Sequence, residues 1–143
     1  MKQILSNDII NQYMPTLVKC PLFNTLGEPE LRGYLNNAKV IIHSYKKNDF
    51  IALAGDPMEG IGVILEGSAL LTRENVMGQR VIMANLEQSD IFGEALLFSK
   101  QPLWPATIKA TKATKIMFIP LETFIKTLPD CHQCQTKILS NRS

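Results

Sequence analysis

The chain has 143 residues, of which 45% are hydrophobic and 20% are charged, and its formal net charge is +2 at pH 7. This balance is typical of one soluble globular domain with a substantial hydrophobic core. No run approaches the roughly 20 apolar residues that span a bilayer, and no secretory signal opens the chain, so we expect a cytoplasmic protein without a membrane partner. Lys46-Lys47 is the only adjacent basic pair, so we do not expect this chain itself to bind DNA.

Residues 1–36 predict two short helices. Apolar side chains recur about once per helical turn across residues 1–14, and Pro15 ends that pattern. Further along, Glu28 and Pro29 stand where a first helical turn favours an acidic side chain and a proline. We therefore expect an amphipathic helix before Pro15 and a second helix that ends at about Leu35.

Residues 38–120 predict a mainly β unit. Short β-prone runs alternate with turn-forming residues, and this spacing favours an antiparallel β-roll or jelly roll with short flanking helices. Both faces of residues 61–66 and of residues 80–86 are apolar, so we expect both strands to be buried on both sides. The seven predicted strands are 40–45, 50–53, 61–66, 69–73, 80–86, 107–111 and 116–119.

Residues 121–143 predict helices again. Cys131, Cys134 and Ile138 have the spacing of a coiled-coil seam, which indicates a dimerisation helix. A helix of this length is too short to be stable alone, so we expect it to be the truncated start of a longer helix. The two cysteines also have metal-ligand spacing. The third cysteine, Cys20, is remote in sequence and an iron–sulfur cluster needs four thiolates, so we favour seam packing and leave a redox role open.

A candidate binding motif comes after the fifth predicted strand, at Phe92-Gly93-Glu94, and continues through Ala95 and Leu96. Ten residues after Glu94 it is followed by Trp104-Pro105-Ala106. The glycine admits close backbone approach, and the free N–H groups at a helix start attract an anion. This stretch resembles the phosphate-binding cassette of cyclic-nucleotide-binding domains, as found in Crp/Fnr-type (cyclic-AMP receptor protein/fumarate-nitrate regulator) transcription regulators. The likeness extends over about residues 20–128.

The resemblance implies a homodimeric sensor domain that binds a small effector and couples it to DNA binding. The expected ligand-binding residues are the motif just described: Phe92, Gly93, Glu94, Ala95, Leu96, Trp104, Pro105 and Ala106. DNA contact would belong to a C-terminal helix-turn-helix domain absent from this chain. The alternative is a stand-alone sensor or interaction module, and a third interpretation is a domain that binds no ligand and only dimerises.

The motif departs from the family pattern at Trp104 and Pro105. In the family a glutamate at the position of Glu94 accepts a hydrogen bond from the ribose, and an Arg-Ser/Thr pair stands where Trp104-Pro105 stands here. An arginine fork on phosphate makes charge-assisted hydrogen bonds of about 1.5–3 kcal/mol each. Losing two of them lowers affinity on the order of a hundredfold to ten-thousandfold, so we expect no high-affinity cyclic AMP binding.

Two questions about this motif stay open at the level of sequence. Arg73, Arg80 or Lys109 could replace the missing arginine only if strand geometry turned it toward the motif. Trp104 could line a pocket for an uncharged or aromatic effector, or it could fill the nucleotide cavity as part of the core. We favour the second interpretation of Trp104.

Nothing in the sequence predicts an enzyme. His43 and His132 lack a partner at catalytic spacing, and we interpret both as structural. Glu94 has no second carboxylate or base positioned to work with it. The metal-binding cupins, which share the jelly roll, need closely spaced histidines that this chain does not have. We therefore expect no metal or resident cofactor other than an unidentified effector.

Overall fold

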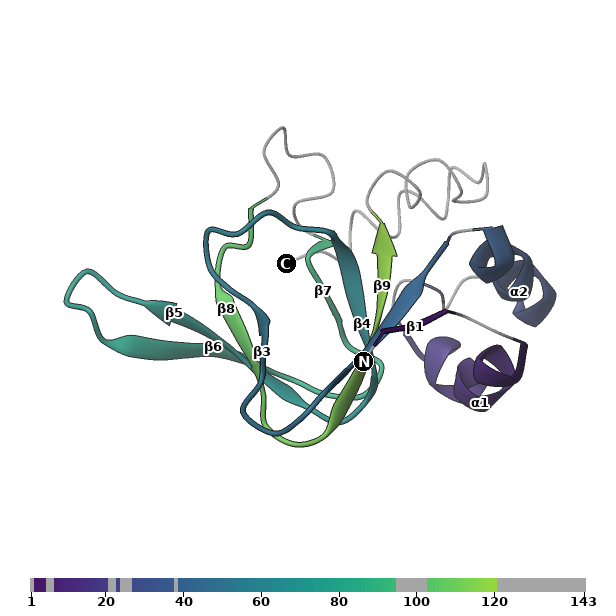
Figure 1. The fold of residues 1–143 in the computed structure, drawn as a ribbon, viewed down its shortest axis with the longest axis horizontal. Helices are drawn as coiled ribbons and strands as arrows, with labels where there is room; N and C mark the ends of the chain where they lie inside the picture. Colours follow the sequence, from purple (N-terminus) through teal and green to yellow (C-terminus); the bar gives the residue numbers. More distant parts are fainter. Residues whose placement is uncertain are drawn as a thin grey trace.

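The computed structural model describes residues 2–4, 7–20, 23, 27–37, 39–94 and 103–120 (Figure 1). Within these ranges two helices and two antiparallel sheets form a β-roll, which confirms the predicted mainly β fold. The helices are α1 (Asn7–Leu17) and α2 (Glu28–Asn37). The strands are β1 (Lys2–Ile4), β2 (Ile41–Tyr45), β3 (Phe50–Ala52), β4 (Gly60–Glu66), β5 (Ala69–Glu74), β6 (Arg80–Leu86), β7 (Ile91–Phe92), β8 (Thr107–Ala110) and β9 (Thr114–Pro120).

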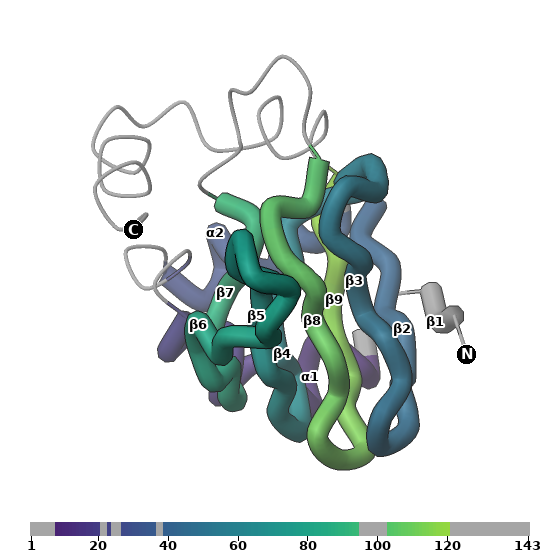
Figure 2. Tube along the Cα trace, turned by 90° about the vertical axis from the view of Figure 1, so that its left-hand side faces the viewer, coloured from purple at the N-terminus to yellow at the C-terminus, as the bar shows by residue number. Residues whose placement is uncertain are grey.

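The roll has two layers that face each other. One, here called the helix-facing sheet, has the strand order β1-β2-β9-β4-β7, and the other, the outer sheet, has the order β3-β8-β5-β6. Figure 2 shows the outer sheet in front of the helix-facing sheet, with α1 behind both. The central pair β4 and β9 is antiparallel, with Val63 opposite Met117.

Strand β4 contributes to two separate cores. Ile61, Val63 and Leu65 point toward the helices and belong to a cluster with side chains of α1 and α2. Ile64 points into the roll, where it packs with residues of the outer sheet such as Ile108. The predicted burial of residues 61–66 on both sides is therefore confirmed at positions 61–65, because the helices cover one face of this sheet and the outer sheet covers the other.

The corresponding prediction for residues 80–86 was wrong for most of the strand, in which only Leu86 is buried. Val81, Ile82 and Met83 are 42%, 63% and 53% exposed. Strand β6 ends the order of the outer sheet and pairs with β5, and the β5–β6 hairpin extends away from the roll (Figure 1). No second layer of the described structure reaches that far, so apolar composition alone did not ensure burial.

The N-terminal prediction needs a second correction. Residues 2–4 form strand β1, which pairs antiparallel with β2, and the first helix begins only at Asn7. Pro15 lies inside α1 rather than at its end. Proline removes one backbone donor, but Val18 N still donates to the carbonyl of Met14 at 3.0 Å, so the helical turn continues past the proline.

Helix α2 begins at Glu28, as predicted, and extends to Asn37. Glu28 also forms an ion pair with Arg32 at 3.0 Å, one helical turn along. The predicted dimerisation residues Cys131, Cys134 and Ile138 lie outside the described residues, and so do Ala95 and Leu96. In the described part of the chain, neither helix is long and apolar enough to cross a membrane.

Candidate functional site

The Phe92-Gly93-Glu94 turn is built on strand β4. Phe92 pairs with Gly62 across β7 and β4, and a Cβ on Gly62 would overlap the Phe92 ring. The absence of a side chain at Gly62 therefore leaves room for the far end of the Phe92 ring against the strand. Gly93 follows with φ +94°, a left-handed conformation that glycine adopts without steric cost. This conformation sets the course of the backbone between β7 and Glu94.

Trp104 reaches this turn from a distant segment. Its backbone is held by two hydrogen bonds of 2.8 Å, one from Gly55 N to the Trp104 carbonyl and one from Trp104 N to the Asp56 carbonyl. Its side chain is only 7% exposed and packs against Phe92, with ring centroids 5.7 Å apart. The structure thus brings Trp104 together with Phe92 and Gly93, as the resemblance implied.

A cavity of about 220 Å³, here called the cassette cavity, opens beside this turn. Its walls are mostly apolar, and among the described lining residues Glu94 is the one with an ionisable side chain. Pro105, which is exposed, is part of the wall, whereas Ala106 is buried and is not part of it. The lining is Leu71, Ala84, Leu86, Ile91, Phe92, Gly93, Glu94, Trp104, Pro105 and Ile108.

Burial raises the pKa of Glu94 above its ordinary value, and a hydrogen bond from its own backbone N–H partly opposes this effect. The ionised form is disfavoured because the surrounding walls offer little solvation. A carboxyl group in this environment is suited to hydrogen bonding with a hydroxyl or amine of a ligand. It is poorly suited to receive an anion such as phosphate.

None of the three candidate replacements for the missing arginine lines the cassette cavity. Arg73 and Arg80 line a separate hollow of about 380 Å³ with Thr72 and Thr107. Lys109 lies 5.6 Å from the centroid of the Phe50 ring and lines another hollow with Arg80. A substitute cation is therefore not found at the turn among the described residues.

Trp104 is both a core residue and part of a cavity wall. Its indole belongs to the buried cluster inside the roll, as a core residue would. It also forms a wall of the cassette cavity and, in addition, of a second pocket. The same indole can therefore pack against core residues and also border a cavity.

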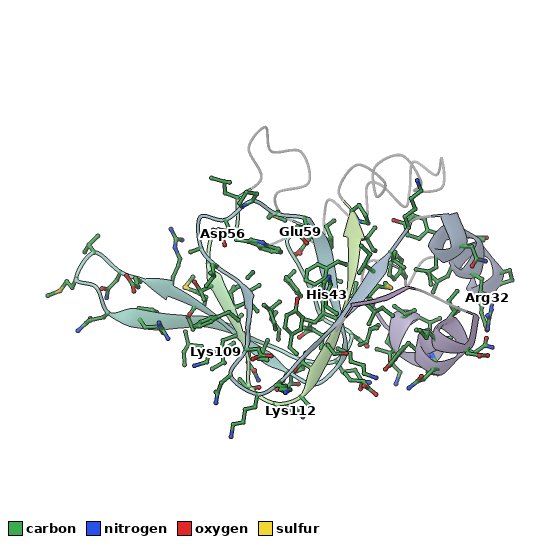
Figure 3. All side chains as sticks on the ribbon, viewed as in Figure 1. Arg32, His43, Asp56, Glu59, Lys109 and Lys112 are labelled. Carbon is green, nitrogen blue, oxygen red and sulfur yellow. The ribbon has the colours of Figure 1, made fainter. Side chains whose placement is uncertain are left out.

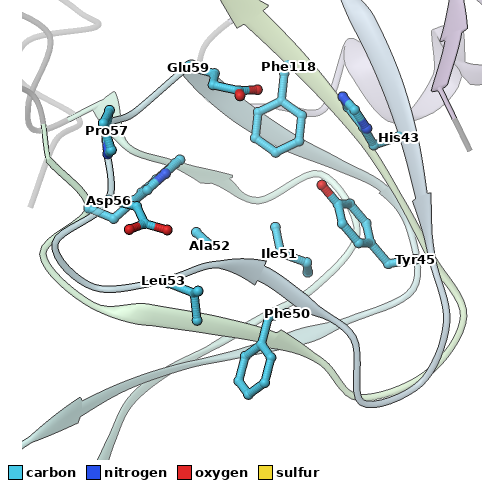
Figure 4. A pocket seen from close by; sticks show the side chains of 11 residues that line it. His43, Tyr45, Phe50, Ile51, Ala52, Leu53, Asp56, Pro57, Glu59 and Phe118 are labelled. Atoms are coloured by element: carbon cyan, nitrogen blue, oxygen red, sulfur yellow. The ribbon is translucent and has the colours of Figure 1, made fainter.

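The second pocket, here called the aromatic pocket, was missed by sequence reasoning (Figure 4). Its volume is about 350 Å³. His43 stacks on Tyr45 with centroids 6.1 Å apart and meets Phe118 edge-on at 5.6 Å. Figure 3 places His43, Asp56 and Glu59 around the same end of the roll. The lining is His43, Tyr45, Phe50, Ile51, Ala52, Leu53, Asp56, Pro57, Glu59, Trp104 and Phe118.

Comparisons with known proteins agree with this architecture. The "cAMP-activated global transcriptional regulator CRP" of Pasteurella multocida is 31% identical over 97 residues, which are 68% of this chain and 46% of that protein. The chain therefore spans about half the length of this curated relative. This relationship confirms the resemblance to Crp/Fnr-type sensor domains.

Two solved structures share the fold. The sensor domain of the transcriptional regulator DNR from Pseudomonas aeruginosa superposes with a TM-score of 0.79 at 18% identity, covering 93% of this chain and 87% of that one. The regulatory domain of Toxoplasma gondii PKA with cAMP has a TM-score of 0.74 at 20% identity, covering 88% of this chain and 47% of that one.

The family assignment rests on the sequence itself. The model of the cyclic nucleotide-binding domain matches residues 42–130, which is more than half of the chain and includes Gly93, Glu94 and Trp104. With a β-roll that places these three residues at one turn, the chain belongs to the cyclic nucleotide-binding domain family.

Proposed function

We propose that this chain is the effector-sensing domain of a Crp/Fnr-type transcription regulator and that its effector is not cyclic AMP at high affinity. The observation that carries the proposal is the contact between Trp104 and the Gly93 turn, at the place where the family has an arginine. A cavity with Glu94 as its one ionisable described lining residue replaces an anion clamp. Family membership and the relationship to CRP support the regulatory role.

The cavity favours a small, uncharged and partly apolar effector. Its volume of about 220 Å³ lies below the roughly 300–1,000 Å³ of drug-sized ligand sites. A donor group on the ligand would bond to Glu94, whose pKa is raised by burial. Apolar parts of the ligand would contact Trp104 and Ile108. A nucleotide-sized ligand would need the indole to move.

The output of the sensor would be a change in dimer geometry. The expected seam of Cys131, Cys134 and Ile138 would pair two copies of the chain, and the effector would shift the population between two arrangements of that pair. DNA would be contacted by a domain outside this chain, in the cytoplasm. The alternative remains a stand-alone sensor or interaction module, which would use the same site without a DNA-binding partner domain.

Titration with cyclic AMP tests the ligand part of the proposal. We expect no saturable calorimetric signal and no thermal shift at micromolar cyclic AMP for the native chain. The double variant Trp104→Arg/Pro105→Ser restores the family pattern and should gain a saturable response. A strong response of the native chain at micromolar concentration would show that Trp104 does not exclude the nucleotide.

A screen of uncharged metabolites by thermal shift tests the sensor part. We expect a hit whose stabilisation is reduced by Glu94→Gln or by filling the cavity with Ala84→Leu. A second candidate function, a domain that only dimerises, is favoured by the burial of Trp104, which is 7% exposed. That candidate predicts no stabilising metabolite in the screen.

Sedimentation velocity tests the dimer. We expect the native chain to sediment as a dimer and Ile138→Asp to sediment as a monomer, because a charge in an apolar seam is costly. Ile82→Asp, on the exposed face of the hairpin, is the matched control and should leave the oligomeric state unchanged. A native chain that is monomeric at high concentration would contradict the dimer model.

A further inference from the structure

The aromatic pocket and the cassette cavity share Trp104 and no other described lining residue. Trp104 lines both, whereas Phe118 lines only the aromatic pocket. The rings of Phe92, Trp104 and Phe118 form the partition, with Phe92 edge-on to Phe118 at 6.0 Å. The pocket's volume of about 350 Å³ is within the range of small-molecule sites.

Aromatic rings make up much of the wall. Tyr45 and Phe118 line it from two neighbouring strands of the helix-facing sheet, and Trp104 lines it from the segment that precedes β8. Figure 4 shows the Tyr45 hydroxyl directed into the space between Phe118 and Ile51. Ring faces carry partial negative charge, and rings arranged around a common space attract a cation.

Asp56 and Glu59 are the acidic side chains that line the pocket, and Lys109, which lies 5.6 Å from the centroid of the Phe50 ring, is not part of its lining. Asp56 and Glu59 are exposed and stand at its rim, and no lysine or arginine is among its described lining residues. The pKa of Tyr45 is raised to about 12 by burial, then by the carboxylates of Glu59 and Asp49. Added negative charge is therefore unfavourable in this pocket, and added positive charge is favourable.

We propose that the aromatic pocket binds a small organic cation, of the quaternary ammonium or protonated amine class, as a site separate from the cassette cavity. The alkyl groups of the cation contact the rings of Tyr45, Trp104 and Phe118, and its charge is balanced by Asp56 and Glu59. A metal ion is not the expected occupant, since the described residues contain no group of three or more His, Cys, Asp or Glu that could hold one.

The test uses choline and its uncharged carbon isostere, 3,3-dimethylbutan-1-ol, with the native chain. Trp104 is the only tryptophan of the sequence, so intrinsic fluorescence reports on the pocket wall directly. We expect choline to change the emission saturably and the isostere to have little effect at the same concentrations. Equal binding of the two compounds, or no saturable change with choline, would overturn the proposal.

Variants assign the signal to the pocket. Asp56→Asn/Glu59→Gln keeps the shape of both exposed side chains and removes their charge, and it should weaken choline binding about tenfold. The control Glu87→Gln removes a charge from an exposed site elsewhere and should bind choline like the native chain. Binding that is unaffected by the double variant would overturn the proposal.

The outcome is independent of the proposed sensing function. A ligand that enters the cassette cavity would also change Trp104 fluorescence, but its binding would depend on Glu94 and not on Asp56 and Glu59. Failure of choline to bind, together with a metabolite hit in the thermal screen, would therefore refute the cation site alone. The reverse pair of results would refute only the effector site.

Discussion

The indole of Trp104 lies over Gly93: a Cβ built on this glycine would stand 3.4 Å from Cζ3 of the ring. The contact puts a large apolar surface at the turn where the family resemblance places an arginine. Glu94, the next residue, matches the family glutamate, but no lysine or arginine is among the described residues that line the cavity beside it. The local chemistry is accordingly that of an apolar cavity with one carboxyl group.

Gly93→Ala should destabilise the domain by about 1–3 kcal/mol. The backbone has φ +94° at this position, and the new Cβ would stand 2.8 Å from Cε of Met58. Urea unfolding followed by circular dichroism measures the change. Gly33→Ala is the matched control, because Gly33 lies in α2 with nothing within 4 Å of the new Cβ, and it should stabilise by about 0.5–1 kcal/mol. Equal effects of the two substitutions would contradict the assigned strain.

Glu94→Gln should stabilise the chain at neutral pH and lose this advantage in acid. The folded state raises the pKa of Glu94 above 4.5, so it binds the proton more tightly than the unfolded state does. Stability from this group is present at low pH and is lost as pH rises through the raised pKa. We expect the melting temperature of the variant to exceed that of the native chain by a few degrees at neutral pH.

The difference in melting temperature should shrink when the scan is repeated below pH 4.5. Glu87→Gln, at an exposed position, serves as the control and should follow the native chain at both pH values. A difference for Glu94→Gln that stays constant with pH would mean that burial of its carboxylate is not the cause.

Trp104→Ala should lower the free energy of unfolding by about 3–5 kcal/mol, as expected for truncation of a buried aromatic side chain. Trp104→Phe retains the contact with Phe92 and should cost less than half as much. The backbone bonds to Gly55 and Asp56 are available to both variants. Urea unfolding, analysed with one m-value for both variants, measures the two losses. Similar unfolding midpoints for Trp104→Ala and Trp104→Phe would show that the indole is not packed as described.

Tyr45→Phe should make the chain less sensitive to alkali. The pKa of Tyr45 is raised from 10.0 to about 12, so the stability that its neutral form provides is present below pH 10 and is lost as pH rises through 12. Unfolding by urea at one pH below 10 and one between 10 and 12 measures that loss. The native chain should lose more stability than the variant, and equal losses would show that Tyr45 is not the cause.

Tyr13, whose pKa is also raised to about 12, contributes in parallel, so Tyr13→Phe should act in the same direction.

Periodicity and turn chemistry were sufficient to predict the strands that carry the roll. The predicted range 80–86 coincides with β6, and residues 61–66 form most of β4. The sequence did not predict β1 and β7, which have three and two residues. Ile4, the apolar residue of β1, fits the helical spacing predicted for residues 1–14, and β7 is too short to show a period; the pairing of both with β2 and β4 is a long-range property.

The binding motif was predictable because it is local, whereas the aromatic pocket was not. Phe92, Gly93 and Glu94 are consecutive, and the resemblance supplied the register to Trp104. The aromatic pocket combines β2, the segment from Phe50 to Glu59, and single residues such as Phe118 that lie far along the chain. His43 and Tyr45, on alternate positions of one strand, were the available signal. Nothing local indicated which rings would face them.

Strand β4 couples the helical side of the domain to the interior of the roll, so neither can move independently of the other. Neighbouring residues along it, Ile64 and Leu65, are both fully buried and belong to different clusters. A displacement of a few tenths of an ångström on the roll side must therefore disturb the packing of α1 and α2, since close-packed interiors transmit strain. The strand can act as a stiff mechanical link that carries a signal from the cavities to the opposite surface of the protein.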